Sequence, residues 1–121
     1  MKTCLVVDDS KVIRKVARHI LETLDFEVAE AGDGRDALTQ CEASVPDVVL
    51  LDWNMPVMNG IECLRRLREE FAGRALKVLM CTTEAEFSRI LEAMQAGADE
   101  YIMKPFTADI VQGKLAGAGA L

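Results

Sequence analysis

The sequence predicts one α/β domain, residues 1–121, in which five βα units form a doubly wound, parallel, five-stranded sheet. Short apolar runs of strand length alternate along the chain with longer stretches in which apolar residues recur at helical spacing. Such alternation requires crossover connections, which are right-handed in parallel sheets. The five apolar runs are residues 4–7, 26–30, 48–51, 78–81 and 101–103.

The character of each run predicts the order of the strands. The runs at 4–7, 48–51 and 78–81 are continuously apolar, as expected for strands buried on both faces. The run at 26–30 alternates apolar and acidic residues, and two acidic residues interrupt the start of the last strand, so these two suit the edges. The pattern fits the order 2-1-3-4-5, in which strands 1 and 3 flank the point where ligands bind.

Two helices are expected in the first half of the chain. Apolar residues between Val12 and Leu24 recur at helical spacing, and Ser10 precedes them as a candidate N-cap. After the turn signal at residues 32–34, the apolar positions around Leu38 indicate a shorter second helix.

Three more helices are expected in the second half. The third follows Asn59 and has apolar residues at helical spacing. The fourth begins with the capping-box pair Thr83 and Glu86 and stops at Gly97. The tail at residues 113–119 is rich in glycine, which costs about 1 kcal/mol relative to alanine inside a helix. We therefore expect the fifth helix to be short or frayed.

Composition and charge argue against several classes of function. Half of the residues are hydrophobic and 28% are charged, which is typical of a globular protein. A net charge of -6 and a pI near 4.8 argue against binding to nucleic acid or to anionic membranes. No apolar run approaches the roughly 20 residues of a membrane span, and no signal peptide is evident, so a cytoplasmic protein is expected. The scattered cysteines lack the spacing of a zinc site and are expected to be reduced.

Carboxylates follow two buried runs at the point where each strand ends. Asp8 and Asp9 end the first run, and Asp52 ends the third. Because strands 1 and 3 are expected to be neighbours, the three acids should meet at one edge of the sheet. Two unit charges ~4 Å apart repel by roughly 4 kcal/mol near a protein surface, so such a trio keeps a proton or holds a cation. An all-oxygen set favours Mg²⁺ or a similar hard ion.

Two more polar side chains end strands at the same edge. Lys104 supplies a cation and Thr82 a hydroxyl donor, beside a carboxylate that can act as a nucleophile. Phosphoryl transfer requires little beyond positioning, a metal and donors for the remaining charge. Each residue alone has a simpler explanation, such as helix capping for the paired acids or a solvated surface lysine. These explanations would all have to hold at once, and a single phosphate site accounts for the whole group.

In this order, the residues resemble the receiver domain of response regulators. An acidic pair, an Asp-x-x-Met-Pro segment, a threonine and a Lys-Pro pair fall at the ends of four strands. The resemblance implies a flavodoxin-like fold with the strand order given above. The matching stretches, residues 6–10, 51–60, 78–82, 95–98 and 101–106, span nearly the whole chain.

The resemblance implies a role for each residue of the site. Asp52 would accept a phosphoryl group from a phosphohistidine on a histidine kinase. Asp8, Asp9 and Asp52 would bind Mg²⁺ together with the backbone carbonyl of Asn54. Lys104 would neutralise the charge of the phosphoryl group. The protein would assist its own phosphorylation and dephosphorylation rather than act as an enzyme on a separate substrate.

The resemblance also implies a switch and a lifetime. Thr82 would hydrogen-bond the phosphoryl group, and Tyr101 would be the aromatic switch residue that turns inward when Thr82 moves. Asn54 and Glu84 stand where the family tunes the lifetime of the phosphoryl group. Because one is polar and the other acidic, we expect a short-lived phosphoryl group. The peptide bond before Pro105 would be cis.

Three functions compete. The leading hypothesis is a stand-alone switch in chemotaxis, acting as a monomer or weak dimer. It would bind a downstream protein through the surface of the fourth helix, fifth strand and fifth helix. The alternative is a phosphorelay intermediate or phosphate sink. A phosphatase of the haloacid-dehalogenase type also uses an aspartate, Mg²⁺ and a lysine, but carries Asp-x-Asp on its first strand. Here the candidate nucleophile is on the third strand, and Asn54 stands two residues beyond it.

Overall fold

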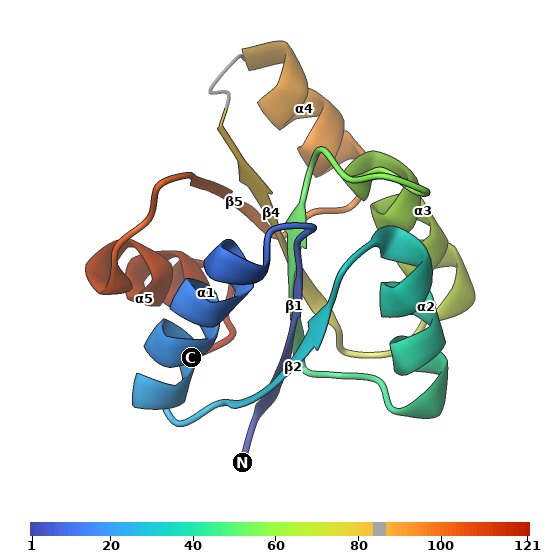
Figure 1. Cartoon of the computed structure of the whole chain (residues 1–121). Coiled ribbons are helices and arrows are strands. Elements are labelled where there is room, and N and C mark those ends of the chain that lie inside the picture. The colour runs from blue at the N-terminus through green and yellow to red at the C-terminus, as the bar shows by residue number, and fades with distance from the viewer. Residues whose placement is uncertain (84–86) are drawn as a thin grey trace.

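The structure is a computed structural model that describes residues 1–83 and 87–121. Five parallel strands form one sheet with helices on both faces, as Figure 1 shows. The strands, in the spatial order β2-β1-β3-β4-β5, are β1 (Thr3–Val7), β2 (Glu27–Ala31), β3 (Val48–Asp52), β4 (Lys77–Thr82) and β5 (Glu100–Met103). The helices are α1 (Lys11–Thr23), α2 (Gly34–Ala43), α3 (Gly60–Glu70), α4 (Phe87–Gln95) and α5 (Ala108–Gly117). The predicted fold class and strand order are confirmed.

Two apolar layers hold the helices against the sheet. Successive side chains of a strand point to opposite faces. Leu5 and Val7 therefore lie in the layer beneath α2 and α3, and Cys4 and Val6 lie in the layer beneath α1 and α5. All five residues of β3 are buried, as expected for the central strand.

The register of the strands brings their carboxyl ends to one edge. Val7 of β1 pairs with Leu51 of β3, so the next residue of each strand is an aspartate at the same level. Thr82 of β4 pairs with Met103 of β5. Lys104, the residue that follows β5, therefore lies just beyond the level of Thr82. The parallel sheet thus places the polar ends of four strands side by side.

Most predicted helix boundaries are confirmed. The Ser10 side chain accepts a hydrogen bond from the backbone N–H of Ile13 at 3.3 Å, and Asn59 accepts one from Glu62 at 2.9 Å. Gly97 follows α4 with φ at +108°, a conformation that favours glycine. The expected capping pair at the start of α4 includes Glu86, which lies outside the described residues.

The expectation of a short or frayed fifth helix is wrong. α5 runs for ten residues, through Gly113 and up to Gly117. Val111 and Leu115 are fully buried against the sheet, and this packing outweighs the poor helix propensity of the glycines. The tail beyond the helix is also packed, because the N–H of Ala120 donates to the carbonyl of Leu115 at 2.8 Å.

No helix in the described part of the chain is long and apolar enough to cross a membrane. The four cysteines are all buried and free of disulfides. His19 lies exposed on α1.

Candidate functional site

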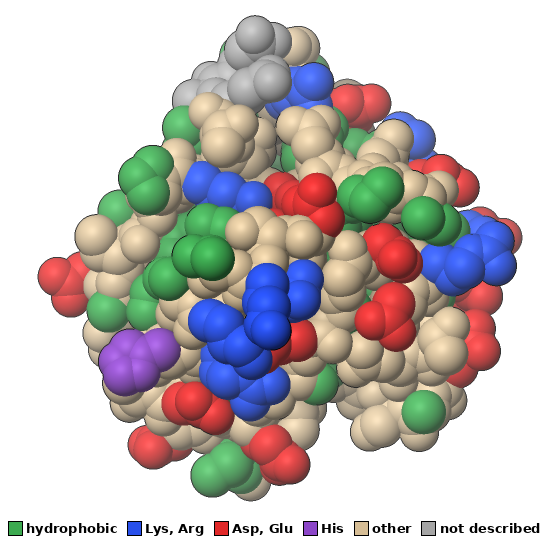
Figure 2. Space-filling model, viewed as in Figure 1, with side chains coloured by type: hydrophobic (Ala, Val, Ile, Leu, Met, Phe, Trp, Pro, Cys, Tyr) green, Lys and Arg blue, Asp and Glu red, His purple; other side chains and the backbone are tan. Residues whose placement is uncertain are grey.

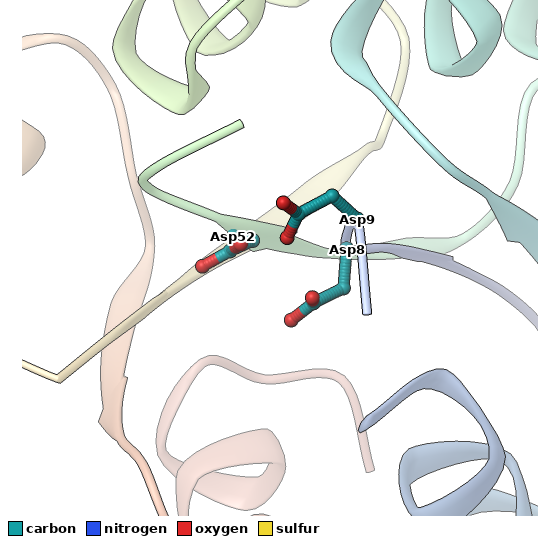
Figure 3. Close-up of side chains that lie close together, drawn as sticks. All are labelled: Asp8, Asp9 and Asp52. Carbon is teal, nitrogen blue, oxygen red and sulfur yellow. The ribbon is translucent and has the colours of Figure 1, made fainter. Parts of the chain in front are cut away.

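Three carboxylates meet at the carboxyl edge of the sheet, as predicted. Asp8 and Asp9 follow β1, and Asp52 is the last residue of β3; Figure 3 shows their side chains converging on one region. One oxygen from each of the three lies within 4.8 Å of the others. Asp8 and Asp52 are buried, at 3% and 6% exposure, and Asp9 is exposed. The cluster therefore combines two desolvated acids with one that faces solvent.

Lys104 joins two of these carboxylates. Its Nζ lies 2.6 Å from Oδ2 of Asp8 and 2.8 Å from Oδ1 of Asp52. Charge-assisted hydrogen bonds of this length are among the stronger polar contacts in proteins. One ammonium group cannot balance three carboxylates, so two negative charges are left over when all the acids are ionised.

Burial and the ion pairs act in opposite directions on the acid and the lysine. Burial raises the pKa of Asp52 above its usual range, and it outweighs the hydrogen bond from Lys104, which favours the charged form. Burial alone would lower the pKa of Lys104, but the hydrogen bonds to Asp52 and Asp8 outweigh it and raise that pKa. Lys104 is thus held protonated beside an acid that gains from a further positive charge.

The residues present fit a hard divalent cation. The donor set consists only of oxygens, and its excess of two negative charges matches the charge of Mg²⁺. The carboxylates already lie close enough together to share one ion. Asn54, whose backbone carbonyl is the fourth predicted ligand, lies exposed in the loop after β3, two residues beyond Asp52.

The structure describes the remaining predicted residues, with one exception. Thr82 is buried at the end of β4. Tyr101 lies half-buried on β5, and the Lys104–Pro105 peptide bond is cis. Glu84, the second lifetime position, lies outside the described residues.

Sequence reasoning did not identify Arg14, which forms a hydrogen bond with the backbone of the acidic pair. Nη1 of Arg14 donates to the backbone carbonyl of Asp8 at 2.6 Å, and Nε donates to Oε1 of Glu30 at 3.0 Å. Lys15 and Arg18 contact the same carboxylate, and Figure 2 shows basic side chains gathered beside acidic ones on this face. The only available signal was the position of Arg14 about one turn into the helix that follows the acids.

The chain's one tryptophan follows Asp52 directly in the sequence. Trp53 is 7% exposed, and the Arg89 guanidinium of α4 lies 5.0 Å from the centre of its ring. The indole therefore stands beside Asp52 in the sequence and also contacts the helix that follows β4. A change at either place should alter its environment.

Comparisons with known proteins agree with this geometry. The sequence matches the family model of the response regulator receiver domain over residues 4–116. Chemotaxis protein CheY of Pseudomonas aeruginosa is 42% identical over 112 residues, which cover 92% of this chain and 90% of that protein. Chemotaxis protein CheY-3 of Vibrio cholerae is 43% identical over 112 residues, covering 92% and 86%. The solved structure of the chemotaxis response regulator CheY4 of Vibrio cholerae has a TM-score of 0.91 at 35% identity and covers 98% of each chain.

Proposed function

The chain belongs to the response regulator receiver domain family, and we propose that it acts as a chemotaxis response regulator whose phosphoryl acceptor is Asp52. The observation that carries the proposal is the convergence of Asp8, Asp9, Asp52 and Lys104 at one edge of the sheet. The names of the relatives support the chemotaxis assignment.

Asp52 is the nucleophile of the proposed reaction. A carboxylate oxygen of Asp52 attacks the phosphorus of a phosphohistidine on the donor kinase. The new P–O bond forms as the P–N bond breaks, and the electron pair passes to the imidazole nitrogen, which then takes up a proton. Lys104 already lies 2.8 Å from Asp52, so its ammonium stabilises the charge that gathers on the phosphoryl oxygens.

Mg²⁺ held by Asp8, Asp9, Asp52 and the carbonyl of Asn54 would supply a second source of positive charge for the phosphoryl oxygens. The chain itself prepares that position. The backbone N–H of Ser10 donates to Oδ1 of Asp8 at 2.8 Å, which fixes the orientation of this carboxylate. Such fixed charges cost little reorganisation during the reaction.

Thr82 and Tyr101 are proposed to couple phosphorylation of Asp52 to partner binding. The phosphoryl group draws the Thr82 hydroxyl toward it, and the Tyr101 ring turns inward as Thr82 moves. The surface formed by α4, β5 and α5 then binds a downstream protein target. The ten-residue helix α5 supports this part of the proposal, because it forms one side of this surface where a short or frayed helix was expected.

The phosphoryl group is proposed to be short-lived. Asn54 is exposed beside the acceptor and leaves room for a water molecule to attack the phosphorus. Spontaneous loss of phosphate would then return the protein to its resting state. The proposal places the protein in the cytoplasm, in keeping with its four free, buried cysteines.

The phosphorelay or phosphate-sink alternative is not favoured, because the curated relatives carry chemotaxis names. The phosphatase alternative fits less well, because the nucleophile lies at the end of β3 rather than β1.

The proposal is tested by incubating the protein with acetyl phosphate and Mg²⁺ and measuring its intact mass. We expect the mass of one phosphoryl group to be added, and we expect neither Asp52→Asn nor wild type in EDTA to gain it. Peptide mapping after borohydride trapping should assign the group to Asp52. Phosphorylation that persists in Asp52→Asn would contradict the proposal, as would catalytic turnover of a separate phosphate ester, which would favour the phosphatase alternative.

A further inference from the structure

A contact between α5 and β5 has no part in the phosphoryl chemistry. Nζ of Lys114 on α5 lies 4.1 Å from the centre of the Tyr101 ring on β5. The same Nζ lies 3.4 Å from Oε1 of Glu100. That oxygen also accepts the backbone N–H of Tyr101 at 3.0 Å. One ammonium group thus contacts both the ring and the carboxylate that precedes it in the sequence.

The surroundings of Lys114 make its contact with the Tyr101 ring strong enough to measure. A cation over an aromatic face is attracted by the electron density of the ring. The side chains of Lys114 and Glu100 are 29% and 25% exposed, so solvent screens their charges only in part. A contact of this kind changes the populations of two ring positions by about two- to fivefold.

The packing of α5 fixes where Lys114 lies. Val111 and Leu115 are fully buried against the sheet, which prevents the helix from rotating about its axis. Gly117 lies one turn beyond Lys114, and a Cβ there would come within 3.5 Å of Oε2 of Glu100. That is an ordinary van der Waals distance, so the Glu100 carboxylate lies against the last turn of α5.

We propose that Lys114 is a positioning residue for Tyr101. It holds the ring in the position seen here, and so it sets the fraction of unphosphorylated protein in which the ring has turned inward. The inference rests on the proposed function, in which Tyr101 turns inward when Thr82 engages the phosphoryl group. Because coupling between two equilibria is reciprocal, a contact that favours the present ring position must weaken the binding of a phosphoryl mimic.

The chain offers a direct probe of the ring. Tyr101 is its one tyrosine, so incorporation of 3-fluorotyrosine gives a single fluorine resonance. Lys114→Met keeps the aliphatic stem and removes the charge, and Lys114→Arg restores a cation. Lys77→Met, at the other end of the sheet at the start of β4, removes the same charge away from the ring.

Two readouts are needed. The first is the relaxation of the fluorine by a neutral gadolinium chelate in the unliganded proteins, which reports the exposure of the ring. The second is the apparent Kd for beryllofluoride with Mg²⁺, followed by the fluorescence of Trp53. We expect Lys114→Met to make the ring less accessible and to bind beryllofluoride about two- to fivefold more tightly. Lys114→Arg and Lys77→Met should behave as wild type does.

Equal or greater ring accessibility in Lys114→Met would overturn the inference, as would an unchanged affinity for beryllofluoride. A different result would overturn the proposed function, namely the failure of wild type to bind beryllofluoride at all. The accessibility measurement needs no phosphoryl mimic. It therefore tests the effect of Lys114 on the ring whichever way the binding experiment turns out.

Discussion

Replacing Glu30 with glutamine is expected to weaken the fold in a way that depends on pH. The carboxylate of Glu30 lies near the end of β2 and forms ion pairs with three basic side chains of α1. Arg14 lies at 3.0 Å, Lys15 at 3.1 Å and Arg18 at 2.7 Å. These contacts tie the first helix to the edge strand, and Arg14 extends them to the backbone of the acidic pair.

The expected loss of stability in Glu30→Gln follows from the lowered pKa of Glu30. Burial alone would raise the pKa of Glu30, but the hydrogen bonds from Arg18, Lys15 and Arg14 outweigh it and lower the pKa from 4.5 to about 2. That difference corresponds to roughly 3 kcal/mol. The Lys15 side chain is 58% exposed, so solvent screens part of the attraction, and we expect about 1–2 kcal/mol in practice.

The sign of the pH dependence is fixed by the lowered pKa. The stabilisation is present above the unfolded pKa near 4.5, and it is lost as pH falls toward about 2, where the folded protein also binds the proton. Urea unfolding of wild type and Glu30→Gln should differ by about 1–2 kcal/mol at pH 7. The difference should shrink steadily below pH 4.5. Glu27→Gln, an exposed acid on the same strand, is the matched control. A difference that is equal at pH 7 and at pH 3, or absent at both, would refute the reasoning.

Three further substitutions test the segment between Asp52 and the start of α3. Val57 is exposed with φ at +70°, so Val57→Asn should raise the free energy of unfolding by about 1 kcal/mol; an unchanged urea midpoint would argue against strain there. A Cβ on Gly60 would collide with the backbone oxygen of Asp52, so Gly60→Ala should lower stability by about 2 kcal/mol, and an unaltered Tm would contradict this. Asn54→Leu should slow the loss of the phosphoryl group after the donor is removed, measured by intact mass over time. A decay rate equal to that of wild type would show that Asn54 does not admit the attacking water.

The fold was predictable because burial marks the strands so clearly. Continuous apolar runs identified the central strands, and acidic residues marked the edges, which together gave the strand order. The fifth helix was misjudged because helix propensity was weighed without tertiary packing. The burial of Val111 and Leu115 and the turn at Gly119, with φ at +76°, are properties of the folded chain.

The site was predictable to the extent that backbone topology determines it. Asp8, Asp52 and Lys104 follow directly from strand ends in a parallel sheet. The contacts of Arg14 with Asp8 and of Lys114 with Tyr101 could not be predicted in the same way. Long side chains on helices reach the sheet only when the helix has a particular rotation, and that rotation comes from core packing on the opposite side of the helix.

The central claim is that Asp52 is a working phosphoryl acceptor in a cation-dependent site. It is tested most directly by titrating beryllofluoride into the protein with and without Mg²⁺ while following Trp53 fluorescence. The indole adjoins Asp52 and is the only tryptophan, so the signal is local. We expect a saturable change that requires Mg²⁺ and is lost in Asp52→Asn. No change, or an equal change in the mutant, would contradict the claim and point to a receiver that binds its partners without phosphorylation.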